Sequence, residues 1–444
     1  MKKYNVTYIT GISFISAMGG YLFGFDFAVI SGALPFLKTT FALNPWWEGF
    51  LTGSLALGCV AGCLLAGRMA DKKGRKPGLM LAALIFAVSS LGMAFSFNLA
   101  FFISMRFAAG IGVGMASMLS PLYIAEISPA EARGRNVAIN QLTIVTGILI
   151  TNLVNYMLSG HGNEVWRWMF GLGAVPSMLF FTGIFWLPES PRWLLTVGRS
   201  AEAEKTLKKI GGNTFAEETI ANIQMSLTGR EKPSLKAVFE KGVRPMIVVG
   251  VTLAVFQQLC GINVVFNYTS TIFESVGASL DRQLFETVGI GAVNLVFTLV
   301  AMWQVDKLGR RPLMLAGSLG LTVIYIILSI LLQHQAPAGI VSVFVMIAIA
   351  LYATSLAPVT WVLISEIFPN HIRGLASSIA TVSLWLAYFI LVFTFPILSA
   401  VLGTYGPFYM YAGICLLGFL FVKFKVKETK GQTLEQLENA IQHA

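Results

Sequence analysis

The chain has 444 residues, of which 56% are hydrophobic and only 12% are charged, and its formal net charge is +10. Soluble globular proteins carry about 25% charged residues, so this composition excludes a chain of this length wrapped in a water-facing surface. A helix needs about 20 mostly apolar residues to cross a bilayer. Runs of this kind lie near residues 9–34, 48–70, 78–97, 99–123, 137–158, 166–187, 245–275, 284–305, 312–333, 340–366, 375–401 and 405–424. We predict an all-α membrane protein with twelve transmembrane helices.

Two polar segments interrupt the apolar runs, one in the middle of the chain and one at its end. They divide the sequence into a six-helix bundle, a linker, a second six-helix bundle and a tail, over residues 1–187, 188–244, 245–424 and 425–444. A modest helical period in the linker predicts short amphipathic helices, and the alternative is a disordered linker. The predicted short helices, including one in the tail, cover residues 200–210, 215–227, 234–241 and 433–441.

Basic residues are unevenly distributed among the segments between the spans. If the N-terminus is inside the cell, the outer loops and outer span ends hold only Lys38, Arg167 and Arg282, and Arg68 and Arg106 lie within spans. The inner segments, together with Lys423 at the inner end of the last span, hold the other 26 of the 31 basic residues. Lys and Arg favour the cytoplasmic side of a membrane, so the linker and both termini are predicted to be cytoplasmic. The positive charge then reflects topology, and we expect no nucleic-acid partner.

Three charged motifs occur twice, each at the same point of a six-span plan. The copies are Asp71 to Arg75 and Asp306 to Arg310, Glu126 to Arg133 and Glu366 to Arg373, and Glu189 and Glu428. Duplicated six-span halves are typical of secondary transporters, in which the solute site lies between the halves near the middle of the membrane. We interpret these residues, with Arg192, as ion pairs of a cytoplasmic gate. The alternative is that the basic residues only anchor the topology.

Four motifs carry a resemblance to a known family. They are Gly67-x-x-x-Asp71-Lys-x-Gly-Arg-Lys76, Pro188-Glu-Ser-Pro-Arg-Trp193, Gln257-Gln-x-x-Gly-Ile-Asn263 and Glu428-Thr-Lys-Gly431. Over nearly its whole length, the chain resembles the sugar porter family of the major facilitator superfamily. The resemblance implies the major facilitator fold, with two pseudo-symmetric six-helix bundles and a cytoplasmic helical linker. It also implies a hexose, a pentose or a related polyol as substrate, and bacterial members that resemble this chain are often proton symporters.

The spans contain polar amides that suit a sugar site. Amides both donate and accept hydrogen bonds, as sugar hydroxyls require, and aromatic rings supply an apolar face. The resemblance assigns the amides to sugar hydroxyls and Trp361 to an aromatic floor, with two further aromatic candidates. The predicted set is Gln141, Gln257, Gln258, Asn263, Asn294, Trp361, Trp385 and Phe23. The alternatives are hydrogen bonds between helices for the amides and packing for the rings.

The sequence departs from the family pattern near this predicted site. Asn267 stands where the family usually has Tyr, and Leu384 stands where relatives often have an amide. Ala357 replaces a Gly that usually precedes the proline. Each departure changes the lining of the site, so the particular sugar does not follow from the resemblance.

A carboxylate within a membrane span is a functional candidate by default, and Asp26 lies deep in the first span. Asp26 precedes Pro35 by nine residues, and Arg106 follows Asn98 by eight. At about 1.5 Å per residue, both lie roughly 12–14 Å below the outer surface, so we predict that they pair. The resemblance supports proton coupling, because proton symporters of this kind carry an Asp at this position. The alternative is a permanent structural ion pair.

Together these features predict a secondary active transporter that imports a monosaccharide with a proton by alternating access. The alternatives are a passive sugar facilitator, sodium coupling, or a transporter-like sugar sensor. The spans show no nucleophile–base set and no metal-ligand spacing, so we expect neither an enzyme nor a metal or cofactor. The expected partners are the sugar, the proton and the lipid bilayer, with the chain a monomer. The expected location is the cytoplasmic membrane, crossed many times.

Overall fold

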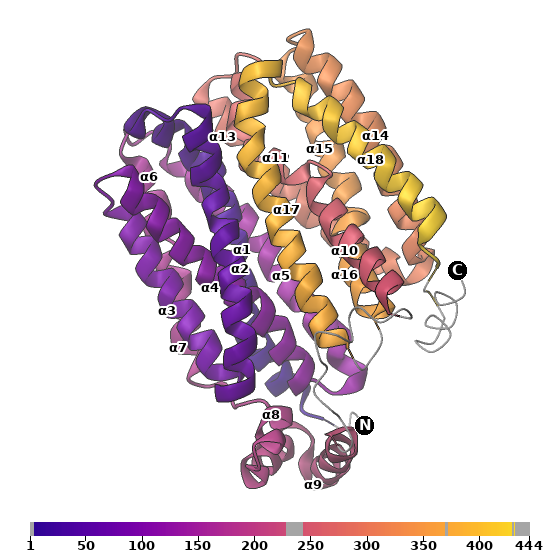
Figure 1. Ribbon diagram of the computed structural model, residues 1–444. Helices are drawn as coiled ribbons and strands as arrows, with labels where there is room; N and C mark the ends of the chain where they lie inside the picture. The colour runs from indigo at the N-terminus through magenta and orange to yellow at the C-terminus, as the bar shows by residue number, and fades with distance from the viewer. Residues whose placement is uncertain (1–3, 228–242, 369–371, 429, 431–444) are drawn as a thin grey trace. The chain divides into compact units, whose positions relative to one another are not determined.

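The computed structural model describes residues 4–227, 243–368, 372–428 and 430 (Figure 1). All regular structure in these residues is helical. Eleven of the helical segments are long and apolar enough to cross a membrane. The predicted span at 166–187 is the twelfth, and it does not reach the length of the others because it is interrupted near Leu172 and Gly173.

The first half of the chain forms the six predicted spans in order. Its helices are α1 (Val6–Phe41), α2 (Pro45–Lys73), α3 (Arg75–Ala94), α4 (Leu99–Ile127), α5 (Ala130–Leu158), α6 (Val165–Gly171) and α7 (Ala174–Ile184). Short turns join them, as expected for antiparallel neighbours. The Asn98 side chain begins α4 by accepting a hydrogen bond from the backbone N–H of Phe101 at 2.8 Å.

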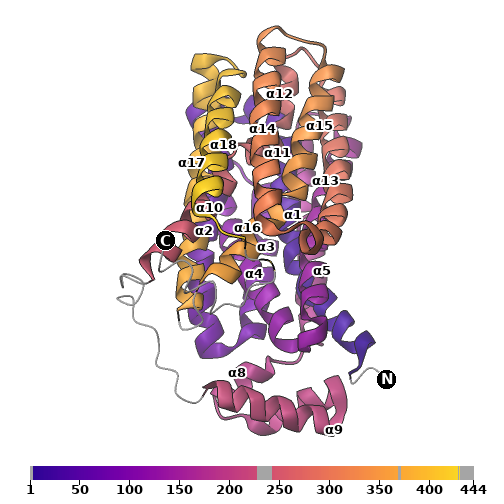
Figure 2. The same ribbon diagram turned by 90° about the vertical axis from the view of Figure 1, so that its right-hand side faces the viewer.

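Helices α8 (Pro191–Thr196) and α9 (Ser200–Leu227) follow the sixth span and lie beyond the ends of α4 and α5 (Figure 2). The two linker helices predicted before residue 228 are present within α9, which contains a kink at Gly212, where φ is +81°. Helix α8 did not appear in the sequence prediction. Its start is capped by Ser190, whose hydroxyl accepts from the backbone N–H of Trp193 at 3.3 Å. The helices predicted over 234–241 and 433–441 lie outside the described residues.

The second half contains two spans that are broken within the membrane. Its helices are α10 (Arg244–Leu259), α11 (Ile262–Asn267), α12 (Thr269–Glu274), α13 (Leu280–Leu308), α14 (Arg310–Gln333), α15 (Ala338–Thr354), α16 (Leu356–Ile367), α17 (Arg373–Leu402) and α18 (Gly406–Lys425). The seventh span divides at Gly261, where φ is +91°, a left-handed conformation that favours glycine. The tenth span divides at Ser355, because Pro358 lacks an N–H and crowds the carbonyl four residues earlier.

The chain forms two compact units that do not follow the two sequence halves. Unit 1 comprises residues 1–26, 57–148 and 167–232, and unit 2 comprises the remainder. Helices α1, α2 and α5 therefore each contribute one part to either unit. The parts within unit 2 are the end of α1, the start of α2 and the end of α5. These are the helix ends on the side of the membrane opposite the N-terminus.

Within unit 2, these parts of α1, α2 and α5 pack tightly against helices of the second half. A Cβ at Gly49 of α2 would lie 2.2 Å from the carbonyl oxygen of Phe393 on α17. The Ser270 hydroxyl on α12 donates to the carbonyl of Ser31 on α1 at 2.8 Å. The Asn152 amide on α5 donates to the carbonyl of Thr287 on α13 at 2.7 Å. We call this packing of residues 27–56 and 149–166 against α12, α13 and α17 the cross-half contact.

Candidate functional site

Unit 1 contains a buried ion pair in the middle of the membrane-spanning helices. Arg106 Nη2 lies 3.4 Å from Asp26 Oδ2, and Arg106 Nη1 lies 3.5 Å from Asp26 Oδ1. Asp26 is 1% exposed and Arg106 is fully buried. The pair that was expected from the matching depths of the two residues is thus present between α1 and α4.

Close approach of backbones places both members of this pair. A Cβ at Gly24 of α1 would lie 2.0 Å from the carbonyl oxygen of Ile144 on α5. A Cβ at Gly58 of α2 would lie 2.0 Å from the carbonyl oxygen of Phe107 on α4. Small residues at such positions let membrane helices pack closely. The helices that carry Asp26 and Arg106 are therefore held near their neighbours within two residues of the ion pair.

A second charged cluster in unit 1 lies at the ends of the spans on the N-terminal side. Arg75 Nη2 donates to Glu126 Oε1 at 2.6 Å, and the Ser190 hydroxyl donates to Glu126 Oε2 at 2.6 Å. The Glu189 carboxylate accepts from the backbone N–H groups of Arg75 at 2.9 Å and Lys76 at 3.1 Å. An anion is stabilised at a helix N-terminus because the first N–H groups have no intrahelical partner. Glu189 thereby ties the end of the sixth span to the start of α3.

Unit 2 repeats this arrangement at the start of α14. The Glu428 carboxylate accepts from the backbone N–H groups of Arg310 and Arg311, each at 3.0 Å. The residue before each capped helix is a glycine with positive φ, +94° at Gly74 and +89° at Gly309. A Cβ at Gly309 would lie 2.8 Å from Glu428 Oε2. The duplication of the motifs in the sequence therefore corresponds to the same local geometry in each unit.

Other predicted gate residues behave differently. Arg133 Nε donates to the carbonyl of Ala125 at 3.0 Å, whereas Glu126 pairs with Arg75. Asp71 is exposed, and its backbone carbonyl accepts from Trp193 Nε1 at 3.0 Å. The side chains of three further predicted gate residues lie outside the described part of the chain, namely Asp306, Glu366 and Arg373.

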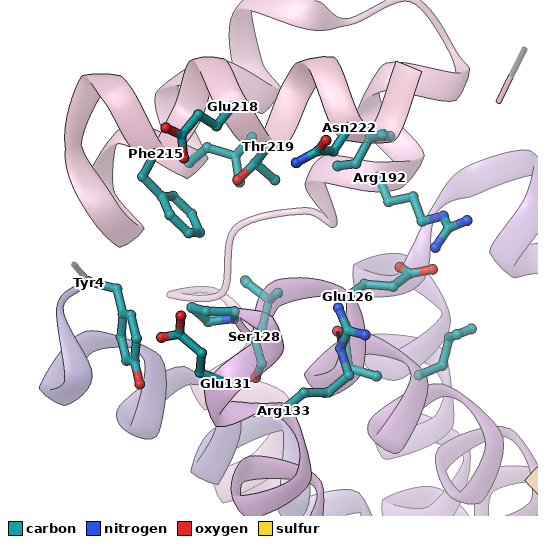
Figure 3. A pocket seen from close by; sticks show the side chains of 16 residues that line it. Tyr4, Glu126, Ser128, Glu131, Arg133, Arg192, Phe215, Glu218, Thr219 and Asn222 are labelled. Atoms are coloured by element: carbon teal, nitrogen blue, oxygen red, sulfur yellow. Dashed lines mark hydrogen bonds between the residues drawn. The ribbon is translucent and has the colours of Figure 1, made fainter. Parts of the chain in front are cut away.

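A cavity of about 620 Å³ lies in unit 1 between α9 and the turn that joins α4 to α5 (Figure 3). Glu126 of α4 and Arg133 of α5 line one side of the cavity, Phe215 and Asn222 of α9 line the other, and Arg192 of α8 lies at one end (Figure 3). Both signs of charge therefore face a space on the N-terminal side of the spans. This places Arg192 beside the same cluster that contains Glu126.

Unit 2 contains a cluster of buried amides around the break in the seventh span. Gln258 Nε2 donates to Gln257 Oε1 at 3.2 Å, and Asn263 Nδ2 donates to Gln258 Oε1 at 2.5 Å. Gln257 Nε2 in turn donates to the carbonyls of Leu356 at 3.3 Å and Ala357 at 3.2 Å. The left-handed Gly261 is the N-cap of α11 and lies between the Gln257–Gln258 pair and Asn263. The sequence motif therefore forms one hydrogen-bonded group of amides.

Two further residues extend the cluster towards α17. Asn267 Nδ2 donates to the carbonyl of Asn263 at 2.6 Å, and the Tyr388 hydroxyl donates to Asn267 Oδ1 at 3.0 Å. Sequence reasoning noted Asn267 as a departure from the family pattern but missed Tyr388. The only signal was its spacing, because Tyr388 lies one helical turn after Trp385.

The remaining predicted sugar residues are divided between the units. In unit 2, Trp385 is buried with its ring centroid 5.8 Å from that of Tyr388. Trp361 is 45% exposed and lies one turn after Ala357, whose carbonyl accepts from Gln257. Asn294 is buried on α13. Gln141 on α5 and Phe23 on α1 belong to unit 1, and both are half-buried.

Comparisons with known proteins identify the family of the chain. Residues 12–441 match the family model described as "Sugar (and other) transporter". The D-xylose-proton symporter of Escherichia coli (strain K12) is 39% identical over 477 residues, which cover 98% of this chain and 96% of that protein. The arabinose-proton symporter of Bacillus subtilis (strain 168) is 36% identical over 444 residues, which cover 98% and 96% of the two chains.

A solved structure is similar over the whole fold. It is the partially occluded inward open conformation of the xylose transporter XylE from E. coli, with a TM-score of 0.87 and 37% sequence identity. The match covers 96% of this chain and 100% of that chain. The fold is therefore that of the major facilitator superfamily, and this chain is a multi-pass membrane transporter and not an enzyme. By its sequence, its helices and its solved relatives, the chain belongs to the sugar transporter family.

Proposed function

We propose that this sugar transporter imports a monosaccharide together with a proton by alternating access. The observation that carries the proposal is the buried Asp26–Arg106 pair. Two charges inside a membrane span are costly unless they are used or mutually compensated. Relatives named as D-xylose-proton and arabinose-proton symporters support the same coupling.

The Asp26–Arg106 pair supplies a physical reason why sugar transport would be coupled to proton movement. While Asp26 is ionised, it compensates the charge of Arg106. When a proton neutralises Asp26, Arg106 remains buried without a counter-ion, and an uncompensated buried charge costs several kcal/mol. The protonated carrier is therefore driven towards a state in which the surroundings of Arg106 change. Sugar binding at the amides of the second half would complete the loaded state that reorients.

The charged clusters on the N-terminal side have a different role in this proposal. We assign that side to the cytoplasm, because the basic residues are concentrated there. The ion pair between Arg75 and Glu126 and the helix caps made by Glu189 and Glu428 stabilise the cytoplasmic ends of the spans. We propose that some of these contacts form and break as the cytoplasmic side closes and opens.

Uptake by purified protein in proteoliposomes tests the proposal. The panel is radiolabelled D-xylose, L-arabinose, D-glucose, D-galactose and myo-inositol, each with and without an inward proton gradient. We expect one or more sugars to accumulate above equilibrium and a protonophore to abolish the accumulation. Asp26→Asn should lose uphill accumulation and keep sugar exchange. Equilibration of the wild-type protein without accumulation would instead identify a passive facilitator, and retained uphill uptake in Asp26→Asn would refute the assignment of the coupling residue.

A further inference from the structure

We propose that Tyr388 is a positioning residue for the sugar site, acting through Asn267 on the amides that bind the sugar. This inference rests on the proposed function, because it assumes that Gln258 and Asn263 contact the sugar. Tyr388 and Asn267 are both fully buried, so neither is itself placed as a sugar ligand. Their effect would pass through hydrogen bonds to the backbone of Asn263, which carries one of the sugar-binding amides.

Two runs of hydrogen bonds meet at Asn263, and together they form an amide chain that connects four helices of the second half. The first run passes from the Tyr388 hydroxyl on α17 to Asn267 on α11 at 3.0 Å, and from the Asn267 amide to the backbone carbonyl of Asn263 at 2.6 Å. The second run passes from the side-chain amide of Asn263 to Gln258 and Gln257 on α10. It ends on the carbonyls of residues 356 and 357 at the start of α16. Each link joins buried groups, and buried polar groups are costly to leave without a partner.

Main-chain carbonyls, which can only accept, fix the direction of each of the two runs separately. Gln257 faces two carbonyls, so it must present its NH₂ group to them and its oxygen to Gln258. Gln258 must therefore donate to Gln257 and accept from Asn263. At the other end, Asn267 faces the carbonyl of Asn263, so its NH₂ group points there and its oxygen is left to accept from Tyr388. A hydroxyl donor at Tyr388 is thus the group that this arrangement requires.

This order leaves defined binding capacity for a sugar. A primary amide has two N–H donors and an oxygen with two lone pairs. The chain uses one N–H and one lone pair of Gln258, and one N–H of Asn263. Both amides therefore hold a single orientation while they retain groups for hydroxyls. Preorganised groups bind more tightly because less ordering is needed on binding.

The ring of Tyr388 is itself held in place from two sides. Its centroid lies 5.2 Å from that of Phe27 on α1 and 5.8 Å from that of Trp385 on α17. Aromatic pairs at such distances are mutually stabilising. The hydroxyl is therefore aimed at Asn267 by packing and not only by the hydrogen bond. In the sequence, Asn267 replaces a tyrosine usual in the family, and here a tyrosine hydroxyl on α17 donates to the Asn267 side chain.

The experiment measures sugar transport by full-length protein in proteoliposomes, with the panel sugar that the wild type transports fastest. Tyr388→Phe removes only the hydroxyl and should raise KM about tenfold, the equivalent of one lost hydrogen bond to a buried acceptor, with kcat changed less than about twofold. Tyr268→Phe is the matched control. Its hydroxyl is equally buried and donates to the carbonyl of Val392 on the same helix, α17, at 2.8 Å, so it loses a similar contact outside the amide chain.

A second variant tests whether Tyr388 acts through Asn267. Asn267→Leu should raise KM to a similar extent, and the double variant with Tyr388→Phe should be no worse than Asn267→Leu alone, because interacting residues are not additive. An unchanged KM in Tyr388→Phe, an equal rise in Tyr268→Phe, or additive effects in the double variant would each overturn the inference. These outcomes are distinct from failure of the proposed function, which would appear as absence of transport of every panel sugar by the wild type.

Discussion

Gly49 offers a direct test of the cross-half contact. The atoms nearest to an added Cβ there are backbone atoms of Phe393, which cannot move aside as a side chain can. A Cβ at this position would lie 2.2 Å from the carbonyl oxygen of Phe393 and 3.1 Å from its Cα. Overpacking of this kind costs about 1–3 kcal/mol. In a carrier with alternating access, Gly49→Ala would pay this cost only while the cross-half contact is closed. We expect the equilibrium to shift roughly 5- to 150-fold towards the state that is open on this side.

The assay follows the opening of the same surface. Ser31 is buried in the cross-half contact, where its carbonyl accepts from Ser270, and Ser31→Cys places a thiol there. The native cysteines are free and buried. The rate at which a hydrophilic maleimide labels Ser31→Cys in detergent should rise when Gly49→Ala is added. If the open state is rare in the parent protein, the fold-increase in the labelling rate should approach the fold-shift in the equilibrium between the closed and open states.

A matched control separates the clash from the general effect of alanine in a helix. Alanine favours helix over glycine by about 0.8–1.0 kcal/mol, and this gain is the same in the open and closed states. Gly413→Ala in α18 carries the same gain, and an added Cβ there meets no atom within 4 Å. Equal labelling rates in Gly49→Ala and Gly413→Ala would show that closure of this surface does not depend on the Gly49–Phe393 approach.

Three further substitutions test the charged groups. Asp26→Asn should lower the free energy of unfolding in detergent by about 3–5 kcal/mol, because Arg106 is left buried without a counter-ion. A denaturant titration measures this loss of stability. The loss should be smaller when Arg106→Met is added to Asp26→Asn. Glu189→Ala removes a carboxylate that caps α3 and should cost about 1–2 kcal/mol, seen as a lower Tm; an unchanged Tm would contradict the cap. Lys38 Nζ lies 3.7 Å from Glu274 Oε2 of α12 across the cross-half contact, so Lys38→Met should raise Ser31→Cys labelling about two- to fivefold, and no change would show that this pair does not hold the contact closed.

Much of the fold followed from the sequence because apolar length is a strong signal for membrane spans. The break at Gly261 was also predictable, since glycine tolerates the left-handed conformation that it adopts. The break at Ser355 carried a signal that was not used. Pro358 crowds the carbonyl of Thr354, so the span predicted over 340–366 was expected to be continuous when its own proline argues for a break.

Site residues were predictable from the sequence where their depth in the membrane or a sequence motif identified them. The hydrogen-bond or ion-pair partner of a given residue was not predictable where several side chains could fill that role. The depths of Asp26 and Arg106 indicated that they pair. The sequence grouped Glu126 with Arg133 in one motif, and only the packing of the span ends shows that Glu126 pairs with Arg75. Tyr388 belongs to no charged or amide motif, so its hydrogen bond to Asn267 emerges only when α11 and α17 are placed together. The division of α1, α2 and α5 between the units likewise depends on long-range packing.

The caps at α3 and α14 have a consequence for the order in which the protein matures. The residues that each cap joins are far apart in the chain, 114 positions for Glu189 and Arg75 and 118 for Glu428 and Arg310. Chains fold as they are synthesised from the N-terminus, so α3 enters the membrane with its first N–H groups still lacking their carboxylate. Each half acquires its cap only when its sixth span has emerged. The third span of each half is therefore completed only after the sixth span of that half has been synthesised.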